Sequence, residues 1–130
     1  MAPESFRFLH AASLLLDHQL QGLGSVPESL QPVLRDATLT EFDRIVETAL
    51  DRKVDFVLLT GDSFVAADHS LAAQSALLSG LELLAGEHIP VFVSTGTLDP
   101  ETAWRSDIEW PENFTRLGPN DLDPVDIEIN

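Results

Sequence analysis

The chain has 130 residues, with 22 acidic side chains against seven lysines and arginines, a formal net charge of −15, and no cysteine. The length suits one domain, and the lack of cysteine excludes disulfide scaffolds, thiolate metal sites and thiol catalysis. A surface this acidic repels a phosphate backbone, because lysine and arginine supply most of the affinity of proteins for nucleic acids. We therefore expect no autonomous nucleic-acid binding.

The apolar stretch from Phe8 to Leu16 follows a basic residue, as the hydrophobic region of a signal peptide does. It is too short to cross a bilayer, which requires about 20 apolar residues. It also contains His10 and is closed by Asp17. We interpret it as a buried strand that runs into a loop, and we expect a cytoplasmic protein with no membrane contact.

Three short apolar runs predict strands, at Phe6 to Ala11, Phe56 to Thr60 and Ile89 to Ser94. Each run is almost continuously apolar, a pattern typical of parallel strands that are buried on both faces. His10 lies within the first run. We expect it to be a hydrogen-bonded core residue and not a ligand.

Two amphipathic helices are predicted between these strands. Apolar residues recur every three or four positions from Leu34 to Leu50, with Pro32 in the first turn. A second such stripe runs from Leu71 to Ala85, with Ser70 as its N-cap and Gly86 as its stop. Strands and helices alternate, which predicts an α/β domain with a parallel or mixed β-sheet and flanking helices.

The remaining residues have a different pattern, with short strand candidates at Phe114 to Leu117 and Val125 to Ile129. Trp104 and Trp110 precede these candidates, and we expect them to be core or interface anchors, since large aromatic side chains dominate both environments. The many acids in this part are expected to lie on a solvated surface. Residues 1–130 are thus predicted to form a single domain.

Chemistry is expected where the three strands end, because the ligands of open α/β sheets gather at the carboxyl ends of parallel strands. The segments that leave the strands are Ala12 to Asp17, Gly61 to Val65 and Gly96 to Pro100. With their strands they read Phe-Arg-Phe-Leu-His-Ala-Ala, Asp-Phe-Val-Leu-Leu-Thr-Gly-Asp, and Ile-Pro-Val-Phe-Val-Ser-Thr-Gly followed by Asp-Pro. In this order they resemble the calcineurin-like metallophosphoesterases. Together with Trp104 and the Glu-Trp-Pro-Glu-Asn segment around Trp110, they are similar to the bacterial DNA-repair exonuclease subunits that work with a coiled-coil ATPase.

The resemblance implies the N-terminal half of a metallophosphoesterase α/β sandwich. That family uses two divalent metals, such as manganese, whose bridging hydroxide attacks phosphorus. By the same resemblance, Asp62 matches the carboxylate that bridges the two metals, and Asp99 matches an acid that lies outside the ligand set. The other matched positions have lost their donors: Ser13, Leu15 and Thr97 replace metal ligands, and Leu98 replaces the catalytic histidine.

These replacements remove most of the metal site that the resemblance implies. Leucine has no lone pair to donate, and hydroxyl groups are weak neutral ligands, so a single carboxylate cannot hold a dimetal centre. We interpret Asp62 as a turn residue and at most a weak remnant of the metal site. Asp17 and His18 could bind an ion with Asp99 only if their loops converge. We assign no catalytic residue and expect no cofactor.

Two functions follow from the sequence. The first is a catalytically inactive metallophosphoesterase-like domain that acts through protein–protein contact, as a homo-oligomer or with a protein partner, which in the family is a coiled-coil ATPase. The second is a metal-dependent phosphodiesterase or DNA exonuclease subunit completed by another chain or by a missing C-terminal half. Since the resemblance implies a domain of about twice this length, the sequence fits both a fragment and a naturally short protein.

Overall fold

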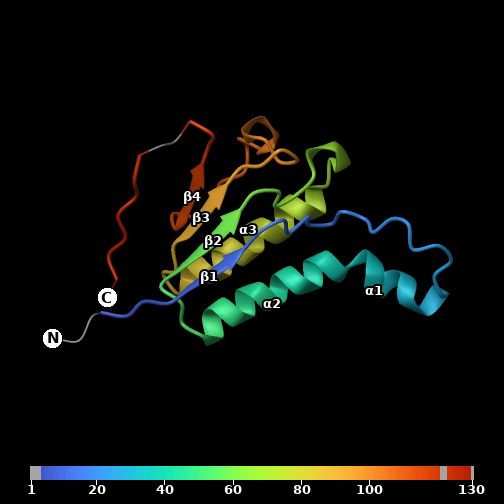
Figure 1. The fold of residues 1–130 in the computed structure, drawn as a ribbon, viewed down its shortest axis with the longest axis horizontal. Helices are drawn as coiled ribbons and strands as arrows, with labels where there is room; N and C mark the ends of the chain where they lie inside the picture. The colour runs from blue at the N-terminus through green and yellow to red at the C-terminus, as the bar shows by residue number, and fades with distance from the viewer. Residues whose placement is uncertain (1–3, 121–122, 130) are drawn as a thin grey trace.

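The structure is a computed structural model that describes residues 4–120 and 123–129. Its four strands form one parallel sheet in the order β1-β2-β3-β4 (Figure 1). This architecture confirms the predicted α/β class and is consistent with the N-terminal half of a metallophosphoesterase. The elements are β1 (Phe8–Ala11), α1 (Gln31–Arg35), α2 (Ala37–Asp51), β2 (Phe56–Thr60), α3 (Leu71–Gly86), β3 (Val91–Ser94) and β4 (Phe114–Leu117), with short 3₁₀ turns at Glu28–Leu30, Ala66–Asp68 and Glu101–Ala103.

The two predicted helices are present, with differences at their ends. The first is interrupted at Asp36, which separates α1 from α2. Ser70 caps α3 as predicted, because its Oγ accepts the N–H of Ala73 at 3.0 Å. The helix ends at Gly86, the stop that the sequence predicted, with Glu87 as its C-cap, and the left-handed residue that follows is His88. Over the described residues, no helix has both the length and the apolarity that a membrane crossing requires.

The strand predicted at Val125 to Ile129 is wrong. These residues belong to no helix or strand. An extended segment becomes a strand only when a neighbour completes its backbone hydrogen bonds. The alternation of apolar residues and the composition of the segment could not show whether such a neighbouring strand exists.

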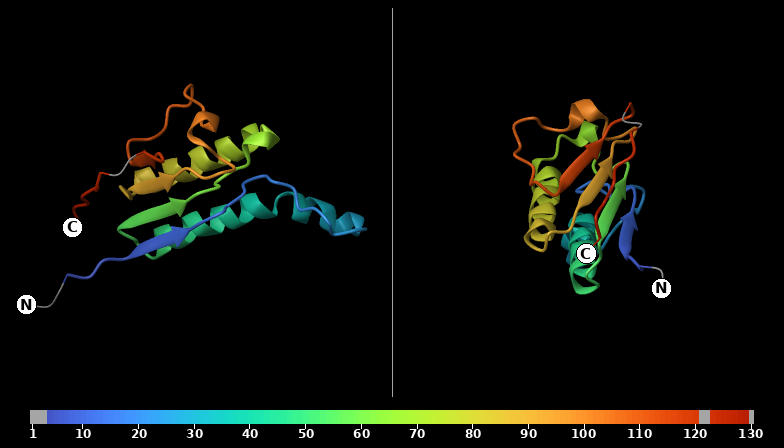
Figure 2. Two further views of the ribbon diagram at one scale, coloured as in Figure 1. Left: turned by 45° about the horizontal axis from the view of Figure 1, so that its top comes forward. Right: turned by 90° about the vertical axis from the view of Figure 1, so that its left-hand side faces the viewer.

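Both long helices pack on the same face of the sheet (Figure 2). The side chains of β2 and β3 that point toward them are buried, namely Val57, Leu59, Val91 and Val93. The opposite face is open at β1, where Phe8 is 49% exposed, whereas Phe92 of β3 on that face is only 9% exposed. The prediction that the strands are buried on both faces is therefore wrong for this part of the sheet. A continuous apolar run in the sequence does not show whether another element covers each face of the strand.

The two helices cross closely at Gly80 of α3, where a Cβ atom would lie 2.8 Å from Cζ of Phe42 in α2. We expect Gly80→Ala to lower the free energy of unfolding by about 1–3 kcal/mol, because overpacking outweighs alanine's better helix propensity. Urea denaturation measures this change. Gly86→Ala is the matched control, since a Cβ at Gly86 meets no atom within 4 Å. Equal effects of the two substitutions would contradict the close crossing.

Candidate functional site

The loops that follow β1, β2 and β3 are joined by backbone hydrogen bonds at the carboxyl edge of the sheet. The N–H of Ser13 donates to the carbonyl of Gly61 at 3.0 Å, and that of Leu15 to the carbonyl of Asp62 at 3.1 Å. The N–H of Gly61 in turn donates to the carbonyl of Ser94 at 3.1 Å. The positions predicted to carry chemistry are therefore brought together.

The carboxylate of Asp99 is the centre of this assembly. It is 0% exposed and accepts backbone N–H groups from Asp62 at 3.0 Å, Ser63 at 3.0 Å and Gly96 at 2.6 Å. Burial raises the pKa of the Asp99 carboxyl above its ordinary range, while the three N–H donors act in the opposite direction. Its main-chain carbonyl also accepts the indole N–H of Trp104 at 3.1 Å. Asp99 thus joins the loop after β2, the loop after β3 and the segment that carries Trp104 by hydrogen bonds.

Asp62 acts within the same loops. Its Oδ1 accepts the N–H of Leu98 at 2.8 Å. The loops approach so closely that a Cβ at Gly96 would lie 2.8 Å from the Asp62 nitrogen. In the structure Asp62 is therefore a turn residue whose side chain holds the next loop in place.

Four non-glycine residues in the loops at this edge have left-handed backbone. Their φ angles are 53° at Ser13, 47° at Leu15, 60° at Asp17 and 56° at Asp62. This conformation costs an L-residue roughly 1–2 kcal/mol. Strained backbone of this kind clusters at functional sites, where the surrounding structure enforces it.

Comparison with known proteins gives the context for these loops. The chain is 37% identical over 106 residues to the uncharacterized metallophosphoesterase YhaO of Bacillus subtilis (strain 168). This match supports the metallophosphoesterase superfamily. It covers 82% of this chain and 26% of that relative, so the chain spans about a quarter of the length of the relative. No protein-family model matches the chain.

The residues that the resemblance matches to metallophosphoesterase metal ligands do not fit a two-metal centre. Ser13 and Thr97 offer only neutral hydroxyl groups, and Leu15 and Leu98 offer no donor. Asp62 supplies the one carboxylate, and one of its oxygens already accepts a backbone N–H. Within residues 4–120 and 123–129, no group of three or more histidine, aspartate or glutamate side chains could hold a metal ion. No step of metal-dependent hydrolysis can be derived from this arrangement.

Asp17 and His18 have partners of their own and do not join Asp99. Asp17 Oδ2 accepts the hydroxyl of Ser70 at 2.6 Å, and this contact links the first loop to the start of α3. His18 Nδ1 lies 2.7 Å from Asp68 Oδ2. The two contacts join residues 53 and 50 positions apart in the sequence, and no local pattern could have indicated them.

The two predicted tryptophan anchors lie on the helix-covered side. Trp104 is 5% exposed, and its ring centroid lies 5.1 Å from that of Phe64 and 5.9 Å from that of Phe114. Trp110 is partly buried and packs 5.6 Å from Trp104. Of the two roles expected for Trp104, core or interface anchor, its burial supports the core role.

His10 differs from its predicted role as a core residue. It is exposed, and its Nε2 lies 2.6 Å from Oγ1 of Thr60 on the neighbouring strand. Successive strand residues point to opposite faces, so Leu9 points to the helices and His10 to the uncovered side. The histidine is hydrogen-bonded as expected, but it lies at the surface.

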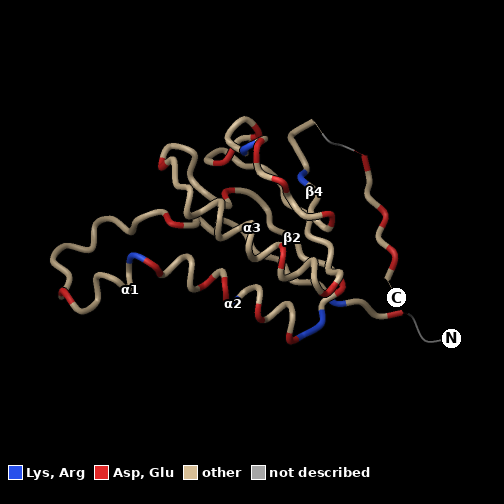
Figure 3. Tube along the Cα trace, turned by 180° about the vertical axis from the view of Figure 1, so that it is seen from behind, with Lys and Arg blue, Asp and Glu red and all other residues tan. Residues whose placement is uncertain are grey.

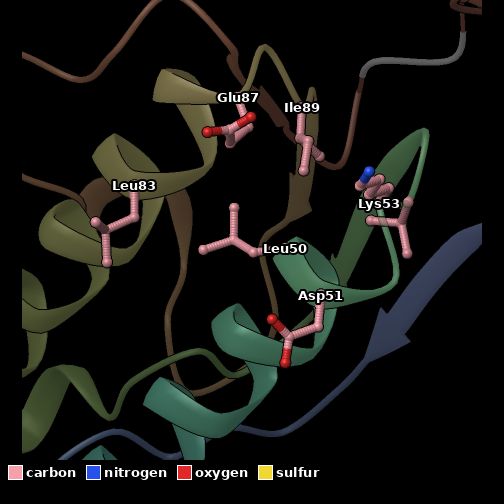
Figure 4. Close-up of a pocket in the computed structure, with 7 residues that line it drawn as sticks. Leu50, Asp51, Lys53, Leu83, Glu87 and Ile89 are labelled. Carbon is pink, nitrogen blue, oxygen red and sulfur yellow. The ribbon is translucent and has the colours of Figure 1, made fainter.

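A groove of about 680 Å³ opens at the other end of the sheet, where α2 and α3 end (Figure 4). Apolar side chains line it, among them Leu50, Leu83 and Ile89, with Asp51 and Glu87 at its rim. It contains no nucleophile beside a base. The loop assembly around Asp99 is therefore the candidate site, and in the structure the carboxylates of Asp62 and Asp99 accept backbone N–H groups that join its loops.

Proposed function

We propose that this chain is a catalytically inactive metallophosphoesterase-like domain that acts through protein–protein contact. The observation that carries this proposal is the use of Asp62, the one remaining carboxylate at a ligand position, as an acceptor for the N–H of Leu98. Leu98 itself occupies the position of the family's catalytic histidine. A domain of this kind needs no metal and no other cofactor.

Protein contact is supported by the uncovered face of the sheet. Phe6 there is 57% exposed and Phe8 is 49% exposed, and their rings stack with 6.2 Å between centroids. Contiguous exposed apolar patches of this kind mark interaction sites. The partner in this proposal is a second copy or another protein, in the cytoplasm.

The charge distribution argues against DNA as the partner. Figure 3 shows the helix side of the molecule, where acidic residues follow α2. Glu41, Asp43, Glu47 and Asp51 are all exposed on this helix. A phosphate backbone would be repelled there, since few cations are available to displace its counterions.

A second candidate function is a metal-dependent phosphodiesterase subunit, completed by another chain or by further sequence. The left-handed backbone at Ser13, Leu15 and Asp62 favours this second function, because strained backbone conformations cluster at active sites and ligand-binding sites. The fourfold greater length of the relative is compatible with further ligands outside this segment. Assignment to the DNA-repair exonuclease branch, with its coiled-coil ATPase partner, belongs to this second candidate.

Hydrolysis of a generic phosphodiester in the presence of Mn²⁺ tests the proposed inactivity of this chain. We expect the rate to stay at background for the unmodified chain and for Asp62→Ala alike. Asp43→Ala, which removes an exposed acid on α2, is the matched control for the change in charge. A rate far above background that Asp62→Ala abolishes and Asp43→Ala leaves unchanged would overturn the proposal of inactivity.

A further inference from the structure

A groove with an apolar lining opens where α2 and α3 end. Val54 and Ile89 in this lining are 7% and 5% exposed, whereas Leu83 is 59% exposed. The groove has a volume of about 680 Å³, within the range of protein ligand pockets. We call it the helix-end groove. Its apolar part is lined by Leu50, Val54, Leu83 and Ile89, and its charged part by Asp51, Lys53 and Glu87 (Figure 4).

An acidic residue stands at the end of each of the two helices that form this groove. Asp51 is the last residue of α2, and Glu87 is the C-cap of α3. The C-terminus of a helix carries a partial negative charge, so a carboxylate is unfavourable there and a cation is stabilising. Both residues are exposed, and none of the ion pairs found in residues 4–120 and 123–129 includes either of them. Their negative charge is therefore not offset by ion pairing within the described chain.

The two helix ends differ in how close basic residues lie along the chain. Arg52 and Lys53 follow α2 directly, and Lys53 lines the groove. No lysine or arginine occurs between Lys53 and Arg105, so α3 and the turn after it contain none. Glu87 lies four residues after Leu83, a spacing that places both on one side of a helix. A departure from local electrostatic preference without a compensating contact within the chain is typical of a functional site.

The charge at the groove distinguishes among the possible occupants. A second copy of the chain presents the same acids and carries a net charge of −15, so it is repelled. A neutral apolar segment would cover the carboxylate of Glu87 without a partner, and burial of an unpaired charge is unfavourable. A segment with lysine or arginine beside its apolar side chains avoids this penalty and offsets the negative end of α3. Charge complementarity therefore favours a basic occupant.

We propose that the helix-end groove binds a basic amphipathic helix of a partner protein. Apolar side chains of that helix lie against Leu50 and Leu83, and its lysine or arginine side chains pair with Asp51 and Glu87. Binding of an amphipathic helix in an apolar groove is a common mode of protein recognition. The inference rests on the proposed role in protein–protein contact, and it names the kind of partner and the surface that receives it.

Fluorescence anisotropy with a labelled synthetic peptide tests this assignment. The peptide carries leucines on one helical face and lysines on the other, and we expect it to bind the unmodified chain saturably. Glu87→Lys should raise Kd roughly tenfold, because an attraction becomes a repulsion beside the bound apolar side chains. Asp43→Lys, the matched control, makes the same change of charge at an exposed position of α2 outside the groove and should change Kd by less than about twofold. Equal effects of the two substitutions would show that binding follows net charge alone and would overturn the proposal.

Three further variants test the groove without a change at Glu87. Leu83→Ser should weaken binding by about fivefold or more, since it removes apolar contact area. Leu71→Ser, at a side chain that is 65% exposed on the same helix, should leave Kd unchanged. Lys53→Glu should tighten binding, because it replaces the cation of the groove with an acid. Equal Kd values for Leu83→Ser and Leu71→Ser, or saturable binding of a peptide with glutamates in place of the lysines, would overturn the proposal.

The outcomes separate this inference from the proposed function. A chain that binds no basic peptide and shows no Mn²⁺-dependent hydrolysis overturns the role of the helix-end groove and leaves the inactive domain in place. A chain whose peptide binding is weakened by Glu87→Lys and not by Asp43→Lys, and which hydrolyses a phosphodiester, overturns the inactive domain and supports the groove.

Discussion

Asp99→Ala should lower the free energy of unfolding by roughly 3 kcal/mol or more. The substitution leaves three backbone N–H groups, those of Asp62, Ser63 and Gly96, without their acceptor in a buried loop assembly. Each unsatisfied buried donor costs about 1–3 kcal/mol. A domain of this size has a total stability of about 5–15 kcal/mol, so this loss is a large fraction of it. Urea denaturation followed by circular dichroism measures the change.

Asp62→Asn is the matched control for that experiment. The amide oxygen can still accept the N–H of Leu98, and asparagine tolerates the φ of 56° at this position, so we expect a loss below about 1 kcal/mol. Equal losses for Asp99→Ala and Asp62→Asn would contradict the central role of Asp99.

The pH dependence of stability provides an independent check on Asp99. Because burial raises its pKa, the folded state favours the protonated carboxyl. The contribution of this group to stability is present below its ordinary pKa and is lost as the pH rises through the raised value. Asp99→Asn should remove this contribution from the pH profile.

The second large effect is a gain of metal binding. We expect no saturable Mn²⁺ binding by the unmodified chain, and we expect the combined substitutions Ser13→Asp, Leu15→His and Thr97→Asn to create it. Carboxylate and imidazole donors would then surround Asp62, and the joined loops already bring the first two positions beside it. Aspartate and histidine tolerate left-handed backbone better than most residues, so these two changes suit the φ angles of 53° and 47°. Titration calorimetry measures the gain.

Adding Asp62→Asn to this combined variant serves as its control. The extra change keeps the hydrogen-bond acceptor but removes the charge, so Mn²⁺ binding should be lost while the thermal unfolding temperature changes little. Binding that persists in this control would show that the ion sits elsewhere and would contradict the placement of the ligand positions around Asp62.

The sequence predicted the order of strands and helices well because this order depends on local patterns. Phe56 to Thr60 and Phe114 to Leu117 are strands over the residues predicted. Burial on the second face could not be predicted in the same way. Apolar side chains such as Phe8 and Phe56 satisfy the pattern of a doubly covered strand whether or not a partner is present.

The candidate site was only partly predictable. The three loops were located from the strand ends, and the loss of donors at Leu15 and Leu98 is visible in the sequence itself. The hydrogen bonds of Asp99 to Asp62 and Ser63 join residues 37 and 36 positions apart. Such contacts depend on the folded geometry of both loops, and for this reason the structure, and not the sequence, distinguishes Asp99 as the centre.

Titration of the unmodified chain with Mn²⁺ tests the central claim most directly. We expect no saturable binding, because Asp62 is the only carboxylate among the matched ligand positions and its Oδ1 already accepts the N–H of Leu98. Stoichiometric Mn²⁺ binding that Asp62→Ala abolishes, and that the control Asp43→Ala preserves, would contradict it.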